Sequence, residues 1–158
     1  VCVVTGGGSG IGLSTSQLFA KRGAKTYVLD LNLESATAVV EGINADEATK
    51  AAGGSAIAIA CDVTDAESVN AAFTRVSTEN DGVLDCLVNN AGVGSVGTVL
   101  ETTAEEMAKL TSVNINGVFH CLQAGVRIMK EKGAGGSIIN MGSIASLIGL
   151  ADRFSYSM

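Results

Sequence analysis

Glycines follow the first apolar run of the chain at a spacing that can bind phosphate. The run "VCVVT" leads into "TGGGSGIG", and a helical pattern comes next. Gly6 permits a tight turn, Gly10 lets the backbone approach a pyrophosphate, and Gly12 lets the helix pack close to the strand. Free N–H groups at a helix start also attract negative charge. The spacing GxxxGxG is not a P-loop, because no Lys follows the final glycine, and by itself it also fits an ordinary strand–helix turn.

An acidic residue ends the second apolar run, where it could contact a nucleotide. Asp30 is placed to accept hydrogen bonds from both ribose hydroxyls of an adenosine, although it could also cap the helix after Leu31. A 2′-phosphate about 5 Å from this carboxylate would be repelled by about 3 kcal/mol at an effective dielectric near 20, roughly a hundredfold in affinity. Neither Ser9 nor Leu31 supplies a compensating cation. The sequence therefore predicts NAD rather than NADP.

Strand-like and helical patterns alternate along the chain and would position these residues. Runs rich in Val, Ile and Leu predict buried strands at residues 1–5, 26–30, 55–63, 84–90 and 137–143. Helices are expected over 11–22, over part of 33–52, after Thr64 and Asp65, and from the capping box of Thr103 and Glu106 as far as Met129. This alternation predicts a single α/β domain over residues 1–158, with a doubly wound parallel sheet of the Rossmann type.

Asn114 is a polar residue on the apolar stripe of the last predicted helix. It shares that stripe with Leu110, Val118 and Cys121. An asparagine is a poor helix former with four hydrogen-bonding sites, so a polar group must meet it in the interior. A satisfied structural asparagine and a functional one both fit this pattern.

Five motifs in order resemble the short-chain dehydrogenase/reductase family across essentially the whole chain. They are "TGGGSGIG", "CDVTD", "NNAG", "VNINGVF" and "GSIINMGS" with a tyrosine thirteen residues after its serine. Alone, "DVTD" would be a strand end with a helix cap, and "NNAG" a strand ending in a turn. S-adenosylmethionine-dependent methyltransferases also fit the "GSGIG" string and the acidic residue after it. They explain neither Asn114 nor the spacing of Ser143 and Tyr156.

The resemblance implies which residues bind the cofactor. Asp62 would contact the adenine amino group with Val63 beside it, and "NAG" at 90–92 would line the adenosine ribose. Ser9 and Ile11 would lie on the phosphate and nicotinamide side. The full predicted set is Gly6, Ser9, Gly10, Ile11, Gly12, Asp30, Leu31, Asp62, Val63, Asn90, Ala91 and Gly92. No metal ion is expected.

The resemblance also implies a catalytic set of Asn114, Ser143 and Tyr156. The tyrosine would act as general acid/base and the serine would donate a hydrogen bond to the substrate oxygen, while the asparagine would kink its helix and hold a water in a proton relay. A free tyrosine is ionised to only about one part in a thousand at pH 7. The family activates it with a Lys four residues later, a position beyond the end of this sequence. Gly142 departs from the second Ser that many relatives carry.

The end of the sequence falls early for this family, whose members have two further strands. We therefore expect this chain to hold the cofactor half and most of the active site, without the substrate lid. An omitted remainder is the favoured explanation. If the chain were a fragment, the fifth strand and the long helix would expose an apolar patch.

Composition excludes several classes of function. The 158 residues are 47% hydrophobic with a net charge of −6, and the sequence has neither a membrane-spanning run nor a basic cluster for nucleic acid. Four scattered cysteines without CxxC or Cys/His pairing indicate core residues in a reducing cytosol, so a cytoplasmic location is expected. The lone His120 also looks structural.

The favoured hypothesis is an NAD-dependent oxidoreductase that interconverts an alcohol and a ketone. A noncatalytic NAD-binding or regulatory module on the same fold is the alternative.

Apolar residues in 93–103 and 144–155 predict a pocket for an apolar substrate body. The resemblance also implies a homo-oligomer, either a dimer or a tetramer. The predicted pocket residues are Val93, Val96, Leu147, Ile148, Leu150 and Phe154.

Overall fold

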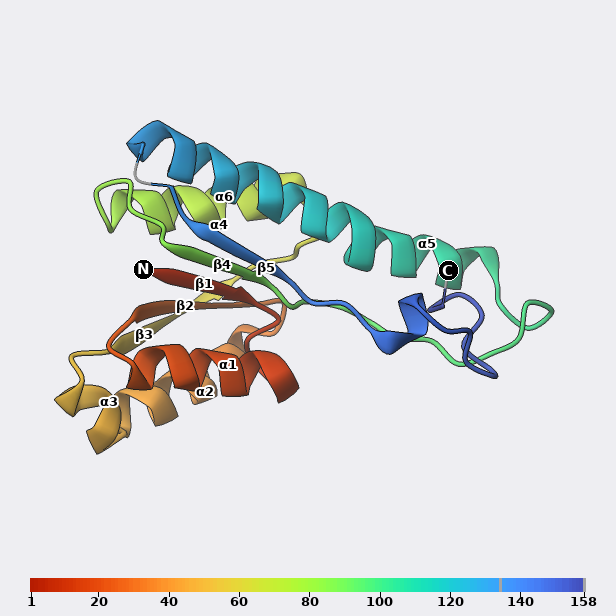
Figure 1. Cartoon of the computed structure of the whole chain (residues 1–158), viewed down its shortest axis with the longest axis horizontal. Helices are drawn as coiled ribbons and strands as arrows, with labels where there is room; N and C mark the ends of the chain where they lie inside the picture. The colour runs from red at the N-terminus through yellow and green to blue at the C-terminus, as the bar shows by residue number, and fades with distance from the viewer. Residues whose placement is uncertain (134, 158) are drawn as a thin grey trace.

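The chain folds into one parallel β-sheet between two layers of helices (Figure 1). The computed structural model describes residues 1–133 and 135–157. The sheet order is β3-β2-β1-β4-β5, and every neighbouring pair of strands is parallel. This confirms the predicted doubly wound sheet. The strands are β1 (Cys2–Thr5), β2 (Lys25–Asp30), β3 (Ser55–Ala60), β4 (Cys86–Asn89) and β5 (Ser137–Asn140).

The helices cover both faces of the sheet, as parallel crossovers require. Figure 1 shows α1, α2 and α3 on one face and α4 with the long α5–α6 helix on the other. A π-helical segment, Ser112–Gly117, lies inside that long helix. The α-helices are α1 (Gly10–Lys21), α2 (Leu33–Ala45), α3 (Glu47–Ala51), α4 (Ala66–Thr78), α5 (Ala104–Thr111) and α6 (Val118–Lys132).

Short polar side chains set several of the boundaries. The predicted helix within 33–52 is two helices, because the Asp46 carboxylate accepts hydrogen bonds from both the backbone N–H and the hydroxyl of Thr49 and so caps a new helix. Strand β3 ends at Ala60 rather than at residue 63, since Asp62 turns the chain by accepting from Thr64. Asp65 and Thr103 cap α4 and α5, and Thr103 forms the predicted capping box with Glu106.

The core lies on both faces of the central strands. Along β2, Tyr27 and Leu29 face the layer of α4 and α6 and belong to one core cluster with Phe73 of α4 and Leu87 of β4. Val28 faces the other way, toward α1 and α2. Because successive side chains of a strand point to opposite faces, the apolar runs of β1, β2 and β4 are buried at nearly every position, as the sequence predicts for them.

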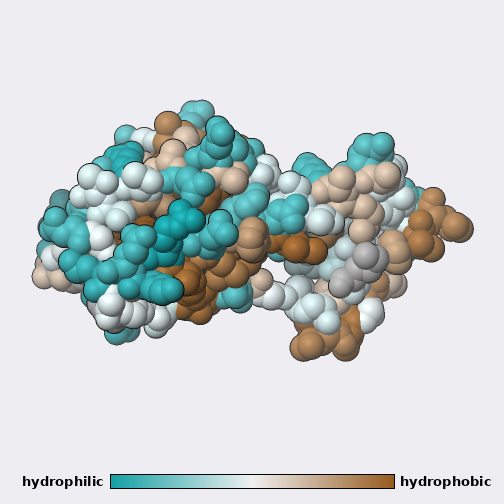
Figure 2. All heavy atoms as spheres, turned by 90° about the horizontal axis from the view of Figure 1, so that it is seen from above, coloured by the Kyte–Doolittle hydropathy of each residue, from teal (hydrophilic) through white to brown (hydrophobic). Residues whose placement is uncertain are grey.

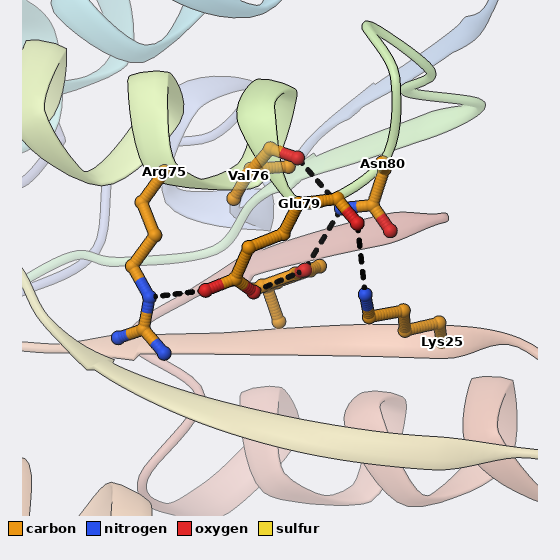
Figure 3. Close-up of polar contacts among 6 residues, drawn as sticks. Lys25, Arg75, Val76, Glu79 and Asn80 are labelled. Atoms are coloured by element: carbon orange, nitrogen blue, oxygen red, sulfur yellow. Dashed lines mark hydrogen bonds and ion pairs between the residues drawn. The ribbon is translucent and has the colours of Figure 1, made fainter.

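A polar network joins the C-terminal end of α4 to β2 (Figure 3). The buried Tyr27 hydroxyl donates to Glu79 Oε2 at 2.8 Å and accepts from Asn80 Nδ2 at 2.8 Å. Arg75 Nε donates to Glu79 Oε1 at 2.8 Å, and Lys25 Nζ donates to the Glu79 carbonyl at 3.3 Å. The bond from Arg75, followed by that from Tyr27, lowers the pKa of the Glu79 carboxyl.

Apolar side chains are exposed on the fifth strand and the long helix. The prediction that residues 137–143 form a buried strand is wrong in its burial, because α6 packs on β4 rather than on β5 and all four residues of β5 are exposed. Ile139 on β5 and Phe119 on α6 are 44% and 57% exposed. Further apolar side chains gather on the lobe formed by the segments after β4 and β5 (Figure 2), where Leu100 and Leu147 are 94% and 80% exposed.

The four cysteines are buried and unpaired by disulfides. Burial raises the pKa of Cys2 and Cys61 to about 11 and that of Cys121 to about 12, so these thiols stay protonated at neutral pH. Over residues 1–133 and 135–157, no helix is both long and apolar enough to cross a bilayer, and no three metal-binding side chains cluster.

Candidate functional site

A groove of about 720 Å³ runs along the carboxyl edge of the sheet, at the point between β1 and β4 where the strand order reverses. In open parallel sheets this crevice is the usual place for a ligand. Except for Gly12, all the predicted cofactor residues line it. They are Gly6, Ser9, Gly10, Ile11, Asp30, Leu31, Asp62, Val63, Asn90, Ala91 and Gly92.

The glycine loop has the backbone geometry that its sequence requires. Gly6 and Gly10 have positive φ values of 61° and 51°, and a Cβ on Gly10 would meet no heavy atom of the described residues within 4 Å. The loop is therefore open to the groove at Gly10. A Cβ on Gly12 would lie 2.2 Å from the Gly6 carbonyl oxygen and 2.5 Å from Asn90 Nδ2. Gly12 thus allows α1 to approach the loop and the end of β4, rather than the body of a strand.

The start of α1 leaves its backbone donors without a side-chain cap. Ser9 is the N-cap residue, but in the described structure its side chain makes no capping bond, and the first turn of α1 holds no acidic residue. Asn32, Asp46, Asp65 and Thr103, in contrast, each cap the helix that follows them. Uncapped N–H groups that point into a groove suit an anionic group of a ligand.

Asp30 is held at the groove by two backbone donors. Gly8 N–H donates to Oδ2 at 2.8 Å and Asn32 N–H donates to Oδ1 at 2.9 Å. A side chain at position 8 would clash, since its Cβ would lie 2.9 Å from Asp30 Oδ2. The alternative in which Asp30 caps the next helix is wrong, because Asn32 is the cap of α2. Each carboxylate oxygen keeps a further lone pair for a ligand.

The side chains of Asp62 and Asn90 form some of their hydrogen bonds within the protein. Asp62 Oδ1 accepts from both the backbone N–H and the hydroxyl of Thr64, which leaves Oδ2 for a ligand. Asn90 Nδ2 donates to the carbonyl oxygens of Thr5 and Gly6 at 2.9 and 3.1 Å. The Asn90 side chain therefore ties the glycine loop to the end of β4.

A second cleft, of about 320 Å³, continues from the first. It shares Ile11 and residues 90–93 with the groove, and it brings together the three predicted catalytic residues. Ser143 Oγ accepts from Ala145 N–H at 3.1 Å, so its own hydroxyl proton is available to another acceptor. Tyr156 is half-buried, on a single helical turn closed by the bond from Ser157 N–H to the Arg153 carbonyl at 2.9 Å.

Asn114 reaches this cleft from the π-helical segment. Its Oδ1 accepts from Val93 N–H and its Nδ2 donates to the Val93 carbonyl, both at 2.9 Å. The side-chain amide therefore pairs with one residue of the loop after β4, as a neighbouring strand would. The helix departs from α geometry over Ser112–Gly117, around this residue. Such π segments are often found at functional sites.

Comparison with known proteins assigns the chain to a family. Residues 1–158 match the family described as short chain dehydrogenase. The chain belongs to this family. It is 40% identical over 153 residues to the probable oxidoreductase EphD of Mycobacterium tuberculosis, covering 97% of this chain and 25% of that protein. It is 38% identical over 157 residues to trans-4-hydroxycyclohexanecarboxylate dehydrogenase of Sinomonas cyclohexanicum, covering 99% and 60%.

The fold of this short-chain dehydrogenase chain also matches solved structures. NAD+-bound xylitol dehydrogenase superposes with a TM-score of 0.85 at 32% identity, covering 99% of this chain and 57% of that one. The chain thus spans between a quarter and three fifths of the length of these three proteins.

Several residues that shape or line the groove are not among those predicted from the sequence. Thr5 Oγ1 accepts from the backbone N–H groups of both Asn90 and Ala91 at 3.0 Å. Lys109 and Ser112 also line the groove. Lys109 precedes Val113 by one helical turn, so helical spacing from the "VNINGVF" motif could have found it.

The predicted apolar pocket is only partly present. Val93 lines the cleft, together with Val118 and Met141. The other predicted members lie outside the described lining of the cleft and are exposed on the surrounding lobe, because the segments that carry them project from the sheet (Figure 1). They are Val96, Leu147, Ile148, Leu150 and Phe154.

Proposed function

We propose that this chain forms the cofactor site and most of the active site of an NAD-dependent oxidoreductase that interconverts an alcohol and a ketone. The observation that carries the proposal is the continuity of the two clefts. Tyr156 and Ser143 line the same cavity as Ile11 and Gly92, which also belong to the cofactor groove. A proton donor is therefore next to the place where a dinucleotide would lie.

The residues of the groove fit a dinucleotide. The uncapped start of α1 and the open backbone at Gly10 suit a pyrophosphate. The fixed carboxylate of Asp30 suits the two hydroxyls of an unphosphorylated ribose. Asp62 keeps one oxygen for an adenine amino group. These features favour NAD, and one relative of known structure is described as NAD+-bound.

The chain's own residues would bind and protonate the substrate. When bound, the nicotinamide supplies or accepts the hydride. The Tyr156 phenol moves a proton to or from the substrate oxygen, and the Ser143 hydroxyl donates a second hydrogen bond to the same atom. Asn114 keeps the loop after β4 in place through both bonds to Val93. We propose that Asn114, in addition to these two bonds, holds a water in a proton relay to the tyrosine.

Replacement of the phenol hydroxyl tests the proposal in the full-length protein. Tyr156→Phe should reduce turnover of secondary alcohols by at least a hundredfold, within the range of acid–base catalysis, while the affinity for NAD stays nearly unchanged. The first substrates to assay are xylitol and trans-4-hydroxycyclohexanecarboxylate, which the names of two relatives suggest. Absorbance at the nicotinamide band measures turnover, and quenching of cofactor fluorescence measures binding.

Tyr27→Phe is the matched control. Tyr27 is the only other tyrosine of the chain, and its hydroxyl is bound to Glu79 rather than facing either cleft. Turnover should survive this change. If Tyr156→Phe retains full activity, the proposed role of the phenol is wrong. If the unsubstituted protein binds NAD but turns over no alcohol or ketone, the noncatalytic NAD-binding module becomes the better interpretation.

A further inference from the structure

The segment that carries Tyr156 has little regular structure of its own. Residues 151–152 and 154–156 form turns, and the last strand before them, β5, ends at Asn140. A proton donor must nevertheless be held to within a fraction of an ångström to work well. Its position therefore depends on what residues 152–155 contact.

Those contacts go to one short piece of the loop after β4. Gly97 N–H donates to the Asp152 carbonyl at 2.8 Å, and Phe154 N–H donates to the Gly97 carbonyl at 3.1 Å. Gly97 and Arg153 thus form an isolated parallel bridge. In Figure 1 the green loop after β4 and the blue segment after β5 run side by side in the lobe at the right.

Ser95 adds two hydrogen bonds to this bridge, one through its hydroxyl and one through its backbone carbonyl. The Ser95 and Ser155 hydroxyls share a hydrogen bond, and Arg153 Nη1 donates to the Ser95 carbonyl at 2.9 Å. Ser155 is only 3% exposed. A buried hydroxyl without a partner costs about 1–3 kcal/mol, so the Ser155 side chain is held where Ser95 can meet it.

The loop is itself fixed on its other side. Val93, two residues before Ser95, is bound at both its N–H and its carbonyl by the side chain of Asn114. A continuous path therefore runs from the long helix, through residues 93–97, to Ser155 and on to the adjacent Tyr156. The path uses side chains of Asn114, Ser95 and Ser155 that the sequence places far apart.

We propose that Ser95 is a positioning residue for Tyr156. Its hydroxyl fixes Ser155, and Ser155 fixes the orientation of the next residue, whose phenol faces the cleft. This inference rests on the proposed function, because it assigns Ser95 a role in the same proton transfer. Ser95 itself lines neither the cofactor groove nor the cleft that holds Tyr156.

The test compares variants of the full-length protein. Ser95→Ala should lower kcat roughly ten- to hundredfold, since small displacements of a catalytic group have effects of this size. The Kd for NAD and the KM for the alcohol should stay within about twofold. Ser155→Ala should give the same loss, and the double variant should lose no more than either single variant, because both remove one contact. Ser95→Thr keeps the hydroxyl and should restore turnover.

The control is Thr102→Ala, which removes a hydroxyl that donates to the Thr98 carbonyl within the same loop. It should leave kcat unchanged. The pH profile of kcat/KM gives a further measurement that a purely structural role of Ser95 would leave unchanged. The apparent pKa assigned to the tyrosine should shift in Ser95→Ala and stay the same in Thr102→Ala.

The outcomes separate this inference from the proposed function. If Tyr156→Phe is inactive but Ser95→Ala and Ser155→Ala both keep kcat within about twofold, the positioning role is wrong and the proposed function stands. Additive losses in the double variant, or a loss of NAD affinity as large as the loss of kcat, would also overturn the inference. If Tyr156→Phe is fully active, the proposed function itself fails.

Discussion

Removal of the Asp30 charge should weaken discrimination between the two nicotinamide dinucleotides. Gly8 and Asn32 fix the carboxylate, and none of the ion pairs found within residues 1–133 and 135–157 includes it. At an effective dielectric near 20, a single negative charge about 5 Å away is repelled by about 3 kcal/mol, roughly a hundredfold in Kd. In Asp30→Asn the ratio of NADP to NAD affinity should therefore rise by up to about a hundredfold.

Titration of both cofactors by fluorescence quenching measures this ratio. Asn keeps one oxygen for the Gly8 N–H but loses the acceptor of the Asn32 N–H, so both affinities should fall and only their ratio reports on the charge. The matched control is Asp62→Asn, a second carboxylate of the same groove, which should change both affinities by the same factor. The reasoning is refuted if the unsubstituted protein binds both cofactors equally, or if Asp30→Asn leaves the ratio unchanged.

Two further predictions concern stability. Gly12→Ala should destabilise by more than about 2 kcal/mol, because its Cβ would lie 2.2 Å from a backbone carbonyl oxygen, whereas Gly42→Ala, on an open face of α2, should stabilise by about 0.5–1 kcal/mol in urea unfolding. The lowered pKa of Glu79 means that its carboxylate contributes stability that is fully present above the unfolded pKa of about 4.3 and is lost as pH falls through the folded pKa. Tyr27→Phe removes one hydrogen bond to this carboxylate, so the free energy of unfolding should depend less on pH in the acid range. Unfolding experiments across pH measure this dependence, and an unchanged slope would contradict the prediction.

The arrangement of strands and helices could be predicted because it depends on local patterns. In "TYVLD" three apolar residues follow one another without alternation, a pattern typical of a strand covered on both faces. The capping box of Thr103 and Glu106 likewise predicts where α5 begins, because it needs only four consecutive residues. Since parallel strands bring all their carboxyl ends to one edge, strand order then placed Asp30 near the glycine loop.

The contacts that shape the groove could not be predicted, because they join residues far apart in sequence. Thr5 ends a strand like many other threonines, and nothing nearby shows that its hydroxyl accepts from Asn90 and Ala91. The sequence required a polar partner for Asn114 but could not identify Val93. The split at Asp46 was missed for another reason: a residue that caps a helix also occurs inside helical patterns, and only the fold decides between these roles.

The same long-range contacts explain how a groove on loops can hold a fixed geometry. Asn90 binds the glycine loop to the end of β4. Asn114 binds Val93, in the loop after β4, to the long helix. Ser95 then ties the loop to the segment of Tyr156. The loop after β4 is therefore bound on one side to the part that would hold the phosphates and on the other to the proton donor. Because one loop carries both sets of contacts, a displacement of the glycine loop should be transmitted to the phenol.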